Sequence, residues 1–207
     1  MNEGVNTTVL DHSGNGNHGS FVGFPVWTNG INGRALRFDG SNQAIKINHS
    51  AVLKPSEQIT ITAWIKASNI TTNRYYEIYR KEDGSNRHLF SFQEYGTILS
   101  FGTPIDGGYA ELDVNISAND YINKWKHVAC SYNGNTKSIY ANGNLLGSAG
   151  ASGLIGTAGT SPVYIGCRAN IDEFFNGTIS DVRIFNRALT AQEISTLYHQ
   201  NSSIIGV

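Results

Sequence analysis

Polar and apolar side chains alternate along the segment from Tyr109 to Ile116, which holds the residues best suited to binding chemistry. Successive residues of a strand point to opposite faces, so the segment is predicted to be a strand with one apolar and one polar face. The face expected to meet the core comprises Ala110, Leu112, Val114 and Ile116. The face expected to point outward comprises Tyr109, Glu111, Asp113 and Asn115.

The outward set has the chemistry of a sugar-binding groove. An aromatic ring offers an apolar surface to a sugar ring, while carboxylates and amides exchange hydrogen bonds with hydroxyl groups. Four residues from neighbouring strands and turns are expected to join this groove: Tyr79, Arg87, His88 and Tyr95. The alternative interpretation is that the aromatic side chains pack in the core or at its rim.

The composition is typical of an all-β chain and argues against several other classes. The 207 residues include 23 glycines, and only 15% of them are charged. Such a chain favours many short strands joined by tight turns, and its length fits one domain spanning residues 1–207. The net charge is −1 with no basic run, which makes a nucleic-acid partner a poor hypothesis. No apolar stretch reaches 18 residues, so no membrane-spanning helix is predicted.

Strands are predicted throughout the chain, with one helix near its end. Thr190 and Glu193 form a capping box, and a one-sided apolar stripe follows it, so a short helix is expected there. Asn133–Thr136 is expected to be a hairpin turn, while Met1–Gly19 and Ala149–Ser161 are interpreted as loops. The predicted strands are 34–38, 44–47, 59–65, 75–81, 88–93, 97–101, 109–116, 126–132, 137–141, 163–167 and 178–185.

Two cysteines, Cys130 and Cys167, stand within apolar runs. Their spacing is not that of a zinc site. Free cysteine commonly behaves as a small buried hydrophobe, whereas a disulfide needs a Cα separation that the sequence does not give. Both interpretations stay open.

Several segments resemble, in order, the laminin-G-like branch of the concanavalin A-like lectin/glucanase superfamily. They are Asn2–Gly4 with Asp11–Gly19, Gly33–Gly40, Ile61–Ile65, Trp125–Ala129, Ile139–Gly143 and Gly177–Leu189. The resemblance implies an all-β jelly roll, a sandwich of two antiparallel sheets of which one is concave, with one short C-terminal helix. It also implies that Trp64, Trp125 and His127 are structural.

The resemblance also bears on catalysis. Glucanases of this superfamily carry a Glu-x-Asp-x-x-Glu arrangement on one strand, in which one carboxyl acts as nucleophile and another as acid/base. Glu111 and Asp113 match the first half, but Asn115 and Ile116 stand where the second Glu should be. Asparagine neither gives nor takes a proton at neutral pH, so the chain is expected not to be an enzyme.

Many superfamily members hold a structural calcium, and the resemblance places a possible site in this chain. Calcium takes several oxygen ligands from carboxylates and loop carbonyls. The matching positions are Asp11, Asp39, Gly40 and Asp181. The late aspartate normally occupies the position of Ser180, one residue earlier, which would point to the other face. The alternative is that these aspartates cap turns and pair with arginines such as Arg183.

These observations lead to a non-catalytic, lectin-like carbohydrate-binding module with a polysaccharide or glycan ligand. Such modules belong to larger secreted or surface proteins, so other domains are expected partners, and an extracellular or cell-surface location is predicted although no signal segment is recognised. A protein–protein adhesion module is the main alternative. A glycoside hydrolase or polysaccharide lyase is the third, because fold alone does not decide function.

Overall fold

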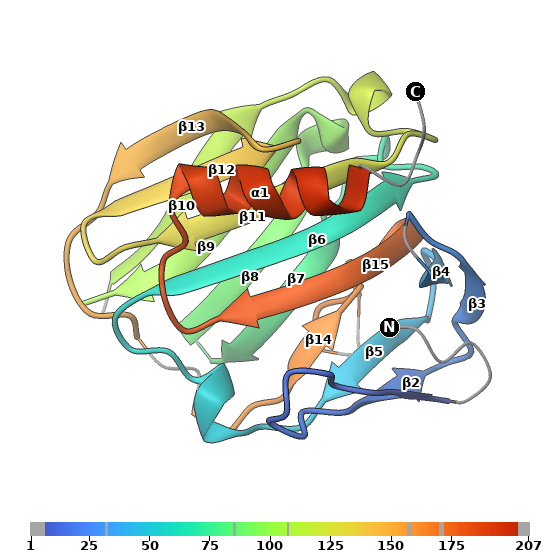
Figure 1. Cartoon of the computed structure of the whole chain (residues 1–207), viewed down its shortest axis with the longest axis horizontal. Coiled ribbons are helices and arrows are strands. Elements are labelled where there is room, and N and C mark those ends of the chain that lie inside the picture. Colours follow the sequence, from blue (N-terminus) through green and yellow to red (C-terminus); the bar gives the residue numbers. More distant parts are fainter. Residues whose placement is uncertain are drawn as a thin grey trace.

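The computed structural model describes residues 7–31, 33–84, 86–106, 108–156, 159–169 and 172–202. Two antiparallel sheets pack face to face, as predicted (Figure 1). The eight-stranded sheet has the order β1 (Thr8–Val9), β2 (Gly19–Val22), β5 (Ala44–Ile47), β14 (Val163–Ile165), β7 (Tyr76–Asp83), β8 (Asn86–Gln93), β9 (Ile98–Ile105) and β10 (Gly108–Asn115). The seven-stranded sheet has the order β13 (Asn144–Gly150), β12 (Thr136–Ala141), β11 (Lys126–Tyr132), β6 (Ile59–Ala67), β15 (Asn176–Phe185), β4 (Arg34–Asp39) and β3 (Val26–Asn29).

The core lies between the two sheets and is built from alternate residues of each strand. Its fully buried members include Phe38, Ile61, Phe90, Phe101 and Ile179. Three one-turn 3-10 helices lie in the connections: η1 (Ala51–Leu53), η2 (Glu94–Gly96) and η3 (Ala118–Asp120). No helix among the described residues is both long and apolar enough to cross a lipid bilayer.

The helix α1 (Ala191–Ser202) covers the side of the seven-stranded sheet that points away from the core (Figure 1). Its capping box is confirmed: the Thr190 N–H donates to Glu193, and the Glu193 N–H donates to the Thr190 hydroxyl. Ile194 packs against Ala129 and Tyr140 of the sheet beneath. Because the helix covers it, β6 is buried on both faces, and Trp64 packs against His127 and Tyr198 as a structural residue.

Both cysteines are free and buried. Cys130 lies in the main core, whereas Cys167 belongs to a separate cluster with Tyr164 and Phe174, so the buried-hydrophobe interpretation is confirmed.

Several sequence expectations about strands were wrong. The N-terminal loop contains the short strand β1, and β2, β3 and β13 were not predicted. The sequence of β13 is rich in Gly, Ser and Ala, so pairing with β12 rather than side-chain propensity places it in the sheet. Ala110, expected in the core, is exposed, because β10 is an edge strand with no further strand beyond it. Asn2–Gly4 lies outside the described residues.

Candidate functional site

The face of the eight-stranded sheet that points away from the core is called the outer face. Strand register aligns a row of polar residues across it, because Glu77 opposes Ser91, Ser91 opposes Ser100 and Ser100 opposes Asp113. Residues directly opposite one another share a face, so the row runs from β7 to β10. The predicted polar face of β10 is therefore continuous with polar residues on three neighbouring strands.

Glu111 is the centre of a hydrogen-bond network on this face. Its Oε1 accepts from the Tyr109 hydroxyl at 2.6 Å, and its Oε2 accepts from Ser100 at 3.1 Å and from Gln93 at 3.2 Å. Arg87 Nη2 lies 3.4 Å from Oε1. Both carboxylate oxygens of Glu111 therefore already accept hydrogen bonds from protein donors.

Tyr109 lies flat against the sheet above Gly102, where any Cβ would collide with the tyrosine hydroxyl. The Arg87 guanidinium covers the ring at 4.0 Å from its centre. Burial, and then the hydrogen bond to Glu111, raise the pKa of Tyr109, which keeps the phenol protonated as a donor. The structure thus brings Tyr109, Arg87 and Glu111 together as predicted, but the aromatic face is already stacked.

Two residues expected in the groove lie elsewhere. A β-bulge between Glu77 and Tyr79 turns both Ile78 and Tyr79 to the interior, where Tyr79 is 1% exposed. His88 follows Arg87 in the strand and therefore points to the opposite face, where its Nδ1 lies 2.8 Å from the Thr103 hydroxyl. The prediction that Tyr79 and His88 line the groove was wrong, because both side chains point into the interior.

The remaining three predicted ligand residues are all exposed. Asp113 is exposed and its Oδ1 accepts from Ser100 at 2.5 Å. Asn115 is exposed at the end of β10. Tyr95 is 51% exposed in η2, where its φ of 61° is a turn conformation.

Sequence reasoning missed a carboxylate–arginine cluster on β7. Arg80 is buried and its Nη1 lies 2.8 Å from Glu77, while its Nη2 binds Glu82. Arg168 reaches Glu82 at 3.2 Å and Glu173 at 3.5 Å. The signal was the two charged residues Glu77 and Arg80 among the apolar residues of the first part of β7, since buried charges are nearly always paired. Glu173 carried no such signal, because it comes from a distant loop.

Glu77 and Glu173 form an unusual acid pair within this cluster. Glu77 is fully buried, and the Oε2 atoms of both side chains are buried without a hydrogen-bond partner. Burial raises the pKa of Glu77 well above its usual value, more than Arg80 lowers it, and the neighbouring Glu173 raises it further. The charged form of Glu77 is therefore disfavoured both by burial and by a neighbouring carboxyl group.

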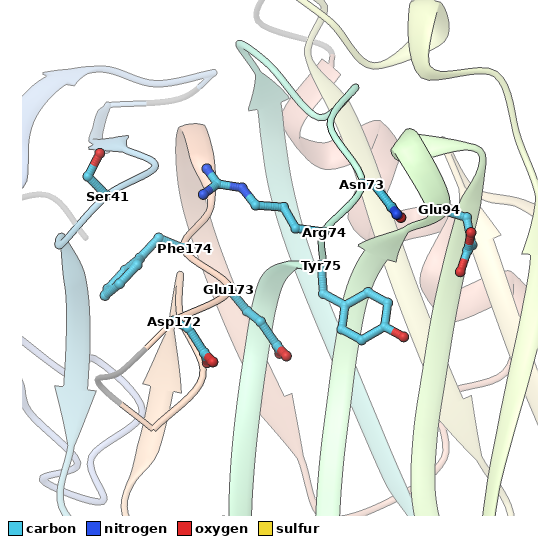
Figure 2. Close-up of a pocket in the computed structure, with 8 residues that line it drawn as sticks. All are labelled: Ser41, Asn73, Arg74, Tyr75, Glu94, Asp172, Glu173 and Phe174. Carbon is cyan, nitrogen blue, oxygen red and sulfur yellow. The ribbon is translucent and has the colours of Figure 1, made fainter.

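A pocket of about 560 Å³ opens beside this acid pair, at the start of β7 and the end of β8. It is lined by Ser41, Asn73, Arg74, Tyr75, Glu94, Asp172, Glu173 and Phe174, and is called the Tyr75 pocket. Figure 2 shows Asp172 and Glu173 directed the same way, beside Tyr75, with Arg74 extending toward Ser41. The Tyr75 side chain is 41% exposed. The pocket therefore combines a free aromatic surface with carboxylate, amide and guanidinium groups.

The predicted calcium residues have other partners. The Asp11 carboxylate accepts from the backbone N–H groups of Ser13 and Asn17, and Asp39 accepts from that of Ser41. Asp181 has a positive φ at the bulge of β15 and binds Arg183 through two hydrogen bonds of 2.9 Å.

Asp181 is also far from Asp39 along the sheet, because Asn176 is the β15 residue that opposes Asp39. In the part of the chain that the structure describes, no three His, Cys, Asp or Glu side chains gather in a group that could hold a metal. Gly40 offers its carbonyl to Arg74 at 2.8 Å. The turn-capping and arginine-pairing alternative is observed, and calcium binding stays a prediction.

Comparison with solved structures shows the same fold in several binding domains. The botulinum neurotoxin serotype G binding domain is 21% identical with a TM-score of 0.77, covering 94% of this chain and 49% of its own. The binding domain of Paraclostridial Mosquitocidal Protein 1 is 18% identical with a TM-score of 0.75. The match covers 92% of this chain and 49% of that domain. The chain thus spans about half the length of these two domains.

A third neighbour is matched over nearly its whole length. Domain 4 of AbnA, a GH43 extracellular arabinanase from Geobacillus stearothermophilus, was solved in complex with arabinotriose. It is 22% identical with a TM-score of 0.72, and 92% of each chain is covered. Comparison with curated proteins finds no match. A family profile described as "Concanavalin A-like lectin/glucanases superfamily" matches residues 39–195, which is well over half of the chain. The chain therefore belongs to the concanavalin A-like lectin/glucanases superfamily.

Proposed function

We propose that this chain is a non-catalytic carbohydrate-binding module and that its ligand occupies the Tyr75 pocket. The observation that carries the proposal is the exposed Tyr75 ring in a pocket lined by carboxylate and amide side chains. An aromatic surface takes the apolar face of a sugar ring, and the surrounding oxygens and nitrogens exchange hydrogen bonds with its hydroxyls. The arabinotriose complex of the AbnA domain supports this class of ligand.

In this proposal the Glu111 network holds the side chains of the outer face in place, and the Tyr109 ring does not contact the sugar. Arg87 already covers the Tyr109 ring, and its side chain is 43% exposed, which leaves guanidinium N–H groups for a ligand that extends from the pocket. A long polysaccharide lying across β7–β10 would meet Arg87 and Asp113 after the pocket residues.

Hydrolysis is not part of the proposal, because the second carboxyl that a glycosidase needs is missing from β10. Asn115 and Ile116 stand where the glucanases carry their second Glu. We further propose an extracellular or surface location as part of a larger protein, because the AbnA neighbour is one domain of an extracellular arabinanase.

The test is binding of the purified chain to an array of glycans and polysaccharides, followed by calorimetry with the best ligand. Tyr75→Ala is expected to weaken binding roughly fivefold or more, because stacking on an aromatic ring contributes on the order of 1 kcal/mol or more. Phe24→Ala is the matched control, since the Phe24 ring is exposed but does not line the pocket. Failure of the folded chain to bind any glycan would contradict the proposal and leave the adhesion module as the better hypothesis.

A further inference from the structure

The cations at the Tyr75 pocket are already engaged. Arg74 is the pocket's arginine, and it donates to the Gly40 carbonyl at 2.8 Å while its guanidinium packs on the Tyr76 ring. Behind the pocket, Arg80 forms ion pairs with Glu77 and Glu82. Arg168 forms ion pairs with Glu82 and Glu173. A ligand anion would have to compete with these partners for a positive charge.

The anions at the pocket are in excess. Glu94, Asp172 and Glu173 line it against the single arginine Arg74. Asp172 keeps only a long ion pair with Arg168, at 3.6 Å, and its side chain is 52% exposed. The pocket wall therefore presents carboxylate oxygens to whatever enters.

The acid pair behind the wall adds an independent constraint. Glu77 and Glu173 each have one buried oxygen without a hydrogen-bond partner. The two arginines beside them, Arg80 and Arg168, are already shared among four carboxyl groups, those of Glu77, Glu82, Asp172 and Glu173. A further carboxylate or sulfate beside Glu173 would add an acceptor where acceptors already outnumber the cations. Bringing like charges together at an interface weakens binding.

We propose that the Tyr75 pocket selects uncharged sugar residues and rejects uronic-acid and sulfated residues. The inference rests on the proposed function, because it names the ligand class of the same site. The neutral hydroxymethyl group of a hexose can donate to the carboxylates of the wall, whereas the carboxylate that replaces it in a uronic acid can only accept.

The test compares neutral glycans with anionic counterparts of matched linkage on the same array. β-1,4-mannan oligosaccharides beside β-1,4-mannuronan oligosaccharides are one such pair, differing only at C6, and sulfated forms of the neutral ligands that bind are another. We expect the anionic member of each pair to bind at least about tenfold more weakly, and the difference to narrow as salt screens the repulsion.

A charge-removing variant shows whether anionic glycans are excluded by charge repulsion or by the shape of the pocket. Asp172→Asn removes one carboxylate from the wall and frees part of Arg168, so it should recover binding of the anionic member by several fold. Glu57→Gln removes an exposed carboxylate that lines a different pocket and should leave the ratio unchanged. Equal or tighter binding of anionic glycans that Tyr75→Ala weakens would overturn this inference alone. No glycan binding at all would overturn the proposed function together with it.

Discussion

His88 should make the fold sensitive to mild acid, and the size of the effect follows from its surroundings. The imidazole is 3% exposed, and its hydrogen-bond partners are the Thr103 hydroxyl and the backbone of Gly156. Burial, together with nearby cations such as Lys81 and Lys137, lowers its pKa from 6.5 to about 4. Because the unfolded chain binds this proton at a higher pH than the folded chain does, stability falls as pH falls below 6.5.

The linkage relation gives the magnitude. With pKa values of 6.5 unfolded and about 4 folded, His88 alone removes about 2 kcal/mol of unfolding free energy at pH 5 and about 3 kcal/mol at pH 4, relative to pH 7. His88→Gln keeps an acceptor and a donor but does not titrate. The gap in unfolding free energy between the wild type and this variant should therefore shift by these amounts in the variant's favour.

Urea unfolding followed by tryptophan fluorescence at pH 7, 5 and 4 measures the effect. Taking the difference between wild type and variant cancels the titration of carboxylates common to both. A His88→Gln difference that stays constant from pH 7 to pH 4 would refute the reasoning, because it would mean that His88 titrates alike in both states.

Three other perturbations have defined outcomes. Thr190→Ala removes the helix cap and should lower the unfolding free energy by about 1 kcal/mol in urea without changing glycan affinity; a large loss of affinity would contradict the separation of α1 from the site. Gly102→Ala should displace Tyr109 and cost about 1–3 kcal/mol, because its new Cβ occupies the position of the tyrosine hydroxyl; an unchanged midpoint of urea unfolding would show that Tyr109 moves freely. If calcium binds near Asp11 and Asp39, a chelator should lower the thermal midpoint and added calcium should restore it, whereas identical melting curves would remove the calcium prediction.

The fold was largely predictable because its signals are local. Alternation along Ile59–Ile65 and Tyr109–Ile116 marks strands, Asn133–Thr136 has the residues of a tight turn, and Thr190 with Glu193 marks the start of the helix. Each of these features depends on residues close in sequence, so the physical reasons for them can be read from the chain itself.

The predictions that failed concern features that depend on contacts between different strands, which the local sequence pattern does not reveal. The bulge after Glu77 reverses the facing of Tyr79, and nothing in the alternating sequence predicts where a bulge falls. The strand β13 exists because β12 lies beside it. Arg87 stacking on Tyr109 was likewise invisible, because it depends on the register of β8 through β10.

The candidate site also divides into residues that local sequence could reveal and residues that only the fold brings together. Tyr109, Glu111 and Asp113 were found because they share one strand, whereas the Tyr75 pocket joins segments around residues 41, 74, 94 and 173. Glu77 and Glu173 are nearly 100 residues apart and meet because the Glu77 N–H donates to the Glu173 carbonyl, which pins that loop to the start of β7. Such a site becomes visible only in three dimensions.

The central claim is that a sugar occupies the Tyr75 pocket, and mapping a bound glycan by amide chemical shifts tests it most directly. Titration of the isotope-labelled chain with the strongest ligand from the array should perturb the amides of Asn73, Arg74, Tyr75, Glu94 and Glu173, with weaker shifts along the outer face toward Arg87. Shifts confined to the seven-stranded sheet or to α1, with the pocket amides unmoved, would contradict the claim.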